Sequence, residues 1–122
     1  MAETLKIPSF ASSVGVLSVI EKILNFKPVR IYYVYNLKKK TPRGRHKHKK
    51  TKQFLVCLHG CISIKVYDKK KNSYKSFNLS KPNYGLLLEP QDWHEYVAKK
   101  NNSIMLVIAS HTYQKKDYIY EK

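Results

Sequence analysis

The run Arg43-Gly44-Arg45-His46-Lys47-His48-Lys49, followed by Gln53 and later by Gly60, is the stretch from which we infer the fold. Side chains alternate between two faces along an extended strand, so His46 and His48 share one face while Lys47 points the other way. Two imidazoles that converge from one strand indicate a site that either holds a metal ion or moves a proton.

Short strand-like segments recur on both sides of this run, and turn-forming residues separate them. The glycine at position 60 marks one such turn, and Pro82 with Asn83 marks another. This spacing predicts an all-β sandwich or barrel. The expected strands are 14–20, 29–35, 45–49, 54–58, 61–67, 74–79, 84–88, 95–98 and 104–109. Only 20–26 and the tail from residue 114 could form a helical turn.

The chain has 122 residues, which suits one domain with a hydrophobic core, and we treat residues 1–122 as that domain. It has no apolar run long enough for a membrane helix and no signal-peptide pattern, so we expect a cytoplasmic protein that does not bind membranes. Cys57 and Cys61 are expected to be strand or core residues, because a disulfide framework needs more bridges.

The formal net charge is +16, which raises the question of nucleic-acid binding. The basic residues are almost all lysines, and the arginines are only Arg30, Arg43 and Arg45, whereas bidentate phosphate contacts favour arginine. The lysine clusters coincide with predicted turns and indicate a solvated surface. A second interpretation of these lysines is that they attract a small anionic substrate. Binding of nucleic acid is the third, and we do not expect nucleic acid as a partner.

The segment 29–35 offers two possible pocket walls. Ile31, Tyr33 and Tyr35 share one face of the expected strand, and Arg30, Tyr32 and Val34 share the other. Tyrosine suits a cavity wall because its ring is apolar and its hydroxyl is polar. Alternation alone leaves open which face lines the pocket.

The spacing of His46, His48, Gln53 and Gly60 resembles the first cupin motif, and the run from Gly85 to His94 approximates the second. The resemblance implies a jelly-roll β-barrel. Cupins usually bind a metal with the histidine pair, an acid and the second-motif histidine, but here Gln53 replaces the acid, and a neutral amide is a weak ligand. His46, His48 and His94 could still bind zinc or iron, so a metal-dependent cupin stays open.

A closer resemblance comes from Arg43 to Lys49 with Gln53, from the run 56–60, from Trp93-His94-Glu95 and from Asp117-Tyr118-Ile119. These motifs are similar to those of the sugar-nucleotide 3,4-ketoisomerases, the WxcM-like members of the RmlC-like cupins that act on dTDP-4-keto-6-deoxy-D-glucose. The resemblance extends from about residue 7 to residue 120. It implies a reaction without metal or other cofactor, in biosynthesis of a 3-amino-3,6-dideoxy sugar for a surface glycan.

The resemblance also implies roles for individual residues. His48 is expected to be the main base and His46 its partner in proton transfer, with a tyrosine, Tyr35 or Tyr33, beside the developing enediolate. The further substrate-binding candidates are Arg43, Gln53, His94 and Arg30. We expect His59 and His111 to be surface residues without a role.

Members of this family form dimers in which the N-terminal strand crosses to the neighbouring barrel, and the resemblance implies the same homodimer here. The run from Ser12 to Leu17 matches a family region associated with the configuration at C4 of the product, and its small residues leave that configuration open. Two alternatives remain beside the metal-dependent one: a noncatalytic cupin that binds a sugar or nucleotide, and an epimerase that acts on a related sugar nucleotide.

Overall fold

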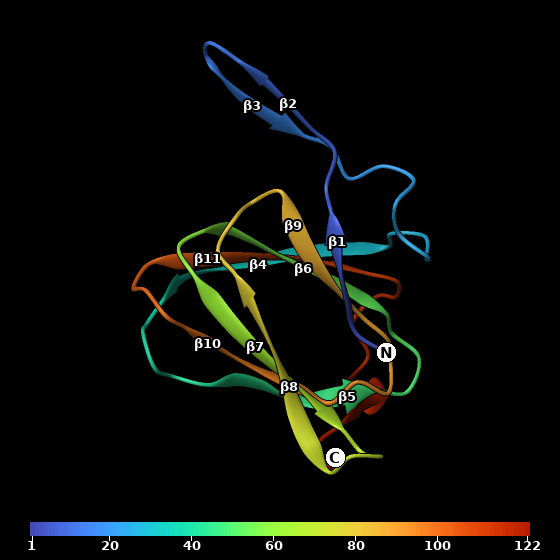
Figure 1. The fold of residues 1–122 in the computed structure, drawn as a ribbon. Coiled ribbons are helices and arrows are strands. Elements are labelled where there is room, and N and C mark those ends of the chain that lie inside the picture. The colour runs from blue at the N-terminus through green and yellow to red at the C-terminus, as the bar shows by residue number, and fades with distance from the viewer.

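The computed structural model describes residues 1–122, and all but one of its regular elements are β-strands (Figure 1). The exception is the short 3₁₀ helix η1 (Lys115–Asp117) in the tail, where a helical turn was possible from the sequence. The strands are β1 (Glu3–Lys6), β2 (Ser9–Ser12), β3 (Gly15–Ser18), β4 (Arg30–Leu37), β5 (Arg43–His48), β6 (Gln53–His59), β7 (Ile62–Asp68), β8 (Ser73–Leu79), β9 (Tyr84–Leu88), β10 (His94–Ala98), β11 (Ser103–Ala109) and β12 (Tyr118–Ile119).

Two five-stranded antiparallel sheets form the barrel. The first has the order β1-β9-β6-β11-β4 and the second the order β12-β5-β10-β7-β8. Consecutive strands repeatedly change sheet, which is the connectivity of a jelly roll. The predicted all-β jelly-roll fold is therefore confirmed. The sequence missed β1 and β2, which are short and carry few buried residues.

The main core lies between the two sheets. It contains alternate residues of β6, β7, β9 and β11, among them Leu55, Ile64, Leu88 and Val107, all nearly inaccessible to solvent. Burial of these side chains removes apolar area from water and fixes the strand register, because a slip of one residue would turn the apolar set outward. Cys57 belongs to this core, as expected, and Cys61 is half-buried.

The turn at Gly60 connects the two sheets. Gly60 has φ +90°, and a Cβ there would lie 2.3 Å from Ser103 Oγ. Only glycine fits this left-handed position against the neighbouring strand β11. The turn thus allows β6 to end in the first sheet and β7 to begin in the second.

A second apolar cluster covers the outer face of the first sheet. Ile20, Ile23, Leu24 and Phe26 pack there against buried residues that include Phe54. The segment that carries them forms bends, so the helical turn considered for 20–26 does not form. Tertiary packing of its apolar residues takes the place of local helical structure.

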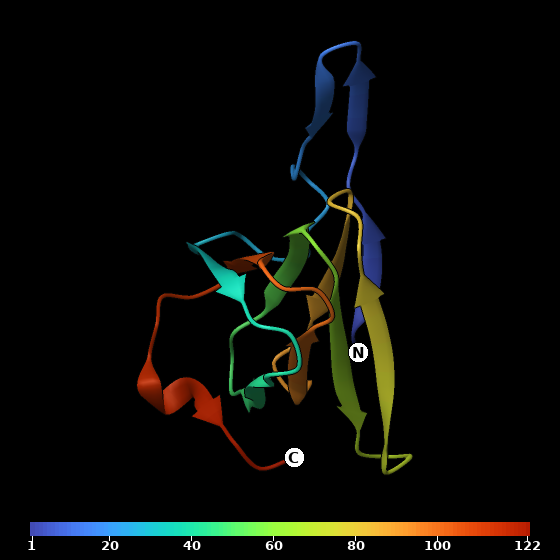
Figure 2. The same cartoon turned by 90° about the vertical axis from the view of Figure 1, so that its left-hand side faces the viewer.

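Strands β2 and β3 form a hairpin that projects from the barrel in both orthogonal views (Figures 1 and 2). It exposes Phe10, Val16 and Leu17, each more than 60% accessible. The outer face of β4 is exposed as well, at Ile31, Tyr33 and other positions. No helix of the structure is long and apolar enough to cross a membrane.

Candidate active site

A cavity of about 470 Å³ opens between the two sheets. Four strands and the C-terminal segment supply most of its polar lining, and apolar residues of β6 and β11 form its floor. Its wall consists of Arg30, Tyr32, Val34, Arg43, Gly44, His46, Gln53, Leu55, His94, Tyr96, Met105, Val107, Tyr113, Tyr118 and Tyr120. Polar groups converging on a largely apolar cavity are typical of a small-molecule site.

Strand β5 carries the two histidines and contains an irregularity. Gly44 and Arg45 both have positive φ, +84° and +62°, and the pairing of β5 with β10 shifts register beside them. Such a bulge bends the strand and redirects its side chains, and bulges recur beside active sites. His46 and His48 still lie on the same side, with ring centroids 4.9 Å apart, as the alternation predicted.

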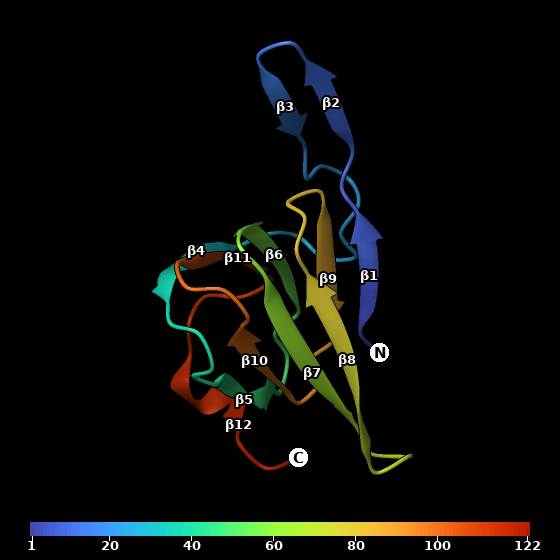
Figure 3. The same cartoon turned by 60° about the vertical axis from the view of Figure 1, so that its left-hand side comes forward.

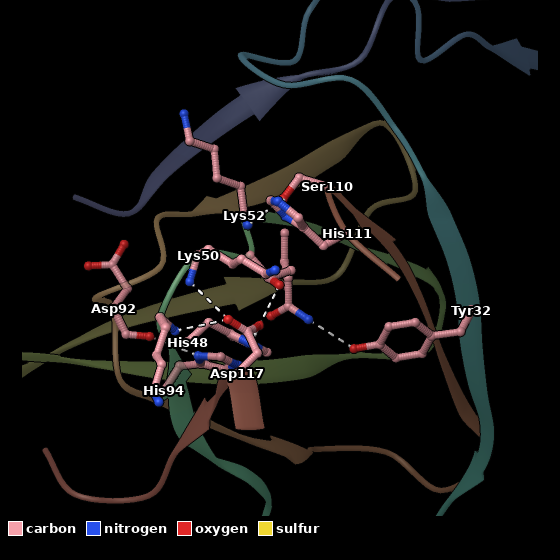
Figure 4. Close-up of polar contacts among 12 residues, drawn as sticks. Tyr32, His48, Lys50, Lys52, Asp92, His94, Ser110, His111 and Asp117 are labelled. Carbon is pink, nitrogen blue, oxygen red and sulfur yellow. Dashed lines mark hydrogen bonds and ion pairs between the residues drawn. The ribbon is translucent and has the colours of Figure 1, made fainter. Parts of the chain in front are cut away.

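His48 is buried behind the cavity wall and is held by Asp117. Its Nδ1–H donates to Asp117 Oδ2 at 2.8 Å, as Figure 4 shows. Burial lowers the pKa of His48 below 6.5, although Asp117 opposes the shift. At neutral pH the imidazole is therefore uncharged, and its buried Nε2 has no hydrogen-bond partner. This nitrogen carries the lone pair that can accept a proton.

Asp117 also accepts hydrogen bonds from the Thr51 hydroxyl and from the backbone amides of Lys49 and Lys50. Burial alone would raise the pKa of Asp117, but the bonds from Thr51, His48 and the Lys50 amide outweigh it and lower the pKa to about 2. The carboxylate is charged throughout the physiological range. It fixes both the tautomer and the orientation of the His48 ring.

His46 faces the cavity directly. Its ring lies between those of His48 and His94, at centroid distances of 4.9 Å and 5.0 Å, and 4.7 Å from the ring of Tyr118. Burial lowers the pKa of His46, while a hydrogen bond at Gly44 acts in the opposite direction. His46 is thus an uncharged imidazole at the cavity surface.

His94 lies deeper, at the start of β10. Its Nδ1–H donates to the carbonyl oxygen of Asp92 at 2.9 Å, so Nε2 is the free acceptor. Burial lowers its pKa to about 3. The structure therefore brings His46, His48 and His94 together, as the sequence suggested.

Tyr32, and not Tyr33 or Tyr35, is the tyrosine of β4 that reaches the cavity. Tyr33 and Tyr35 lie on the outer face and are 63% and 61% exposed, which corrects the sequence prediction for both. The reason is strand alternation: the face of β4 that carries Arg30, Tyr32 and Val34 is the one that points toward the core. Alternation in the sequence alone leaves open which of the two faces lines the pocket.

Gln53 is buried and donates its Nε2–H to the Tyr32 hydroxyl oxygen at 3.0 Å (Figure 4). Because the Gln53 amide donates a hydrogen bond to the Tyr32 oxygen, the Tyr32 O–H stays free to donate its own hydrogen bond into the cavity. Burial raises the pKa of Tyr32 to about 12, so the hydroxyl remains protonated. Gln53 thus acts through Tyr32 at the position where a metal-binding cupin has its acid.

Arg30 and Arg43 place two permanent positive charges in the cavity wall. The Arg30 guanidinium lies over the rings of Tyr32 and Tyr113, 5.3 Å and 5.8 Å from their centroids, and its buried Nε has no partner. Arg43 donates through Nε to the Tyr96 hydroxyl at 3.1 Å, which leaves the rest of its guanidinium available. Both fit an anionic ligand.

No group of three or more His, Cys, Asp or Glu side chains is arranged to hold a metal ion. His48 and His94 have each committed Nδ1 to another partner, a carboxylate and a carbonyl. His59 is exposed and His111 half-buried, and neither lines the cavity.

The sequence reasoning missed the contribution of the C-terminal segment. Tyr113, Tyr118 and Tyr120 all line the cavity, and β12 pairs with β5 beside His48 (Figure 3). The sequence assigns no role to Asp117, which belongs there only to the motif Asp117-Tyr118-Ile119. Its role depends on a contact 69 positions away along the chain, which no local pattern reveals.

Comparisons with known proteins identify the family and the fold. The family model described as FdtA: WxcM-like, C-terminal matches residues 2–122. A curated relative from Aneurinibacillus thermoaerophilus, TDP-4-oxo-6-deoxy-alpha-D-glucose-3,4-oxoisomerase, is 38% identical over 107 residues, which are 86% of this chain and 76% of the relative.

Two solved structures are similar over nearly the whole chain. A variant of the 3,4-ketoisomerase QdtA from Thermoanaerobacterium thermosaccharolyticum, in complex with TDP-4-keto-6-deoxyglucose, has TM-score 0.92 and 33% identity, covering 98% of this chain and 87% of its own. The TDP-quinovose 3,4-ketoisomerase WlaRB from Campylobacter jejuni has TM-score 0.91 and 29% identity, covering 98% and 92%.

The two-sheet fold and the solved structures that it matches define this protein as a cupin. More specifically, the chain belongs to the FdtA family, whose model it matches over residues 2–122. The resemblance seen in the sequence is thereby confirmed.

Proposed function

We propose that this protein is an isomerase that converts TDP-4-keto-6-deoxy-D-glucose into the corresponding 3-keto sugar. The observation that carries the proposal is the convergence of uncharged His46, protonated Tyr32 and two arginines on one cavity, in a chain 38% identical to a TDP-sugar 3,4-oxoisomerase. A product with its ketone at C3 suits transamination to a 3-amino-3,6-dideoxy sugar.

The reaction moves two hydrogens and no other atoms. A base removes the proton on C3, which the neighbouring ketone acidifies, and the electron pair becomes the double bond of a 3,4-enediolate. The O3 proton leaves as the C3 ketone forms, O4 gains a proton, and C4 receives a proton on carbon. Atoms and electrons balance without an oxidant. Histidine suits these steps because it can act as base and acid near neutral pH.

In this proposal His46 contacts the substrate, because its ring lines the cavity whereas His48 lies behind it. The assignment reverses the roles expected from the sequence. His48 is uncharged and oriented by Asp117, and its ring centroid lies 4.9 Å from that of His46. It either accepts the proton from His46 or stabilises the positive charge that forms on His46. The charged Asp117 favours the protonated state of the pair.

Tyr32 is proposed as the donor to the enediolate oxygen. A preorganised donor in a site shielded from water stabilises charge that develops in the transition state. Gln53 supports this role by directing the Tyr32 O–H into the cavity.

Arg30 and Arg43 are proposed to bind the diphosphate of the nucleotide. Guanidinium groups match phosphate oxygens in geometry and charge. The surrounding lysines raise the local concentration of an anionic substrate, an effect that weakens with salt.

Substrate incubation tests the function directly. Proton and carbon NMR of TDP-4-keto-6-deoxyglucose with the protein in D₂O should show the ketone moving from C4 to C3. Epimerisation would leave the ketone at C4 and invert a neighbouring centre, and a noncatalytic cupin would leave the substrate unchanged. Turnover that persists after exhaustive chelation would remove the metal-dependent alternative, and its loss would overturn the metal-free reaction.

We further propose a homodimer in which the N-terminal region of one copy crosses to the other. The exposed apolar residues of the β2–β3 hairpin and of the outer face of β4 support it, because patches of this kind mark interfaces. Tyr33 and Tyr35 would then be interface residues. Light scattering should give twice the mass of one chain, and Ile31→Lys should shift it to the monomer. The cytoplasmic location expected from the sequence stays a prediction.

A further inference from the structure

Three aromatic rings, two in strands of the second sheet and one directly before β10, surround a lysine of the C-terminal segment. The Nζ of Lys122 lies 5.4 Å from the ring centroid of Tyr67, 4.8 Å from that of Tyr74 and 5.0 Å from that of Trp93. The rings also pack on one another, with the Tyr67 and Tyr74 centroids 5.4 Å apart and those of Tyr74 and Trp93 6.2 Å apart. We call Tyr67, Tyr74 and Trp93 the aromatic cage.

The cage is the partner of the Lys122 ammonium. Each ring presents its electron-rich face to a cation within the 6 Å range of cation–π attraction. No carboxylate forms an ion pair with Lys122. The three rings therefore hold the Lys122 ammonium. A neutral side chain at this position would lose the cation–π attraction.

The same tryptophan also holds the backbone of this segment. Trp93 is 3% exposed, and its Nε1–H donates to the Tyr120 carbonyl oxygen at 2.9 Å. Trp93 therefore fixes Tyr120 through its indole edge and Lys122 through its ring face. Its neighbour in the chain, His94, lines the active-site cavity.

Tyr118 and Tyr120 belong to the cavity wall, but they are anchored differently. Tyr118 lies in β12, which pairs with β5, and it follows the buried Asp117. Tyr120 lies beyond β12 and is 66% exposed, so its carbonyl bond to Trp93 and the cage two residues later are what hold it. Loss of the cage contact should release residues 120–122 and leave β12 in place.

We propose that Lys122 is a positioning residue: its ammonium, bound in the aromatic cage, holds the C-terminal segment so that Tyr120 completes the mouth of the active-site cavity. The effect on catalysis rests on the proposed function, whereas the holding of the segment does not. Cation–π attraction of this kind shifts the balance between held and released segment by about tenfold.

The first test needs no substrate. Trp93 is the only tryptophan, so its emission reports on the cage. Lys122→Gln should change the emission and lower the backbone ¹⁵N order parameters at residues 120–122, Lys122→Arg should restore both, and Lys116→Gln should match the natural protein. Lys116 is the matched control, because it is exposed in the same segment and, unlike Lys122, forms no cation–π contact. Unchanged emission and unchanged order parameters in Lys122→Gln would overturn the proposal.

The second test separates binding from chemistry. Lys122→Gln should raise KM for the TDP-sugar about threefold to tenfold with kcat within about twofold, and Lys122→Arg should restore KM. An unchanged KM, or a loss confined to kcat, would overturn the positioning role. If the natural protein turns over no TDP-sugar, the proposed function fails, and the emission and order-parameter measurements still decide whether the cage holds the segment.

Discussion

Acidification should destabilise the protein through His94, and the size of the effect follows from its burial. The His94 imidazole is 4% exposed, and its pKa is lowered to about 3. In the unfolded chain the pKa returns to 6.5. Below pH 6.5 the unfolded state therefore binds a proton that the folded state does not, so stability is lost as the pH falls.

The magnitude is about 2 kcal/mol at pH 5 relative to pH 7.5, taking 1.36 kcal/mol for each pH unit below 6.5. His46 and His48 act in the same direction, because burial also lowers their pKa. The pKa of Asp92 is raised by burial, and its opposing effect is common to the natural protein and the variant described next. The stability that Asp117 contributes is lost only as the pH falls from about 3.8, its pKa in the unfolded chain, toward about 2 in the folded state, so it has almost no effect at pH 5.

The assay is guanidinium unfolding followed by Trp93 emission at pH 5 and pH 7.5, at one protein concentration. In His94→Asn the amide keeps a donor near the Asp92 carbonyl and does not titrate. Its stability should fall by about 2 kcal/mol less than that of the natural protein over the same interval. Equal losses in the two proteins would refute a buried, uncharged His94.

Further predictions concern the site and the fold. His46→Asn should lower kcat about 10²-fold to 10⁴-fold in a steady-state assay and keep TDP affinity, and turnover near the natural value would refute its contact with the substrate. Tyr32→Phe should lower kcat about 10²-fold, whereas Tyr35→Phe should leave it unchanged, and equal effects would contradict the assignment of the inner face. Asp117→Ala should cost about 3 kcal/mol in denaturant titrations because it leaves buried donors without an acceptor, and a neutral result would contradict the network. Gly60→Ala should cost about 1–3 kcal/mol in the same titrations because its Cβ meets Ser103 at a positive φ, and a neutral result would contradict the geometry of this turn.

The fold could be predicted because its signals are local. Alternation in β7, the short apolar runs of β6 and β11 and the turn at Gly60 mark strands of a two-layered barrel, and the spacing of His46 and His48 places both on one face. The short strands β1 and β2 bury little of their own surface, so periodicity gives no signal for them.

The site could be predicted only in part, because its finer geometry depends on distant contacts. Choosing Tyr32 over Tyr33 requires knowing which face of β4 meets the second sheet. Placing His46 at the surface and His48 behind it requires the position of Asp117, which comes from the C-terminal segment. Alternation along one strand contains neither fact.

The central claim is that this cavity moves a ketone from C4 to C3 of a TDP-linked 6-deoxyhexose. The most direct measurement is carbon NMR of TDP-4-keto-6-deoxyglucose labelled with ¹³C at C4, recorded during incubation with the natural protein and with His46→Asn. The C4 resonance should change from a ketone to a secondary alcohol with the natural protein only. A C4 signal that remains a ketone at high concentration of the natural protein would contradict the proposed function.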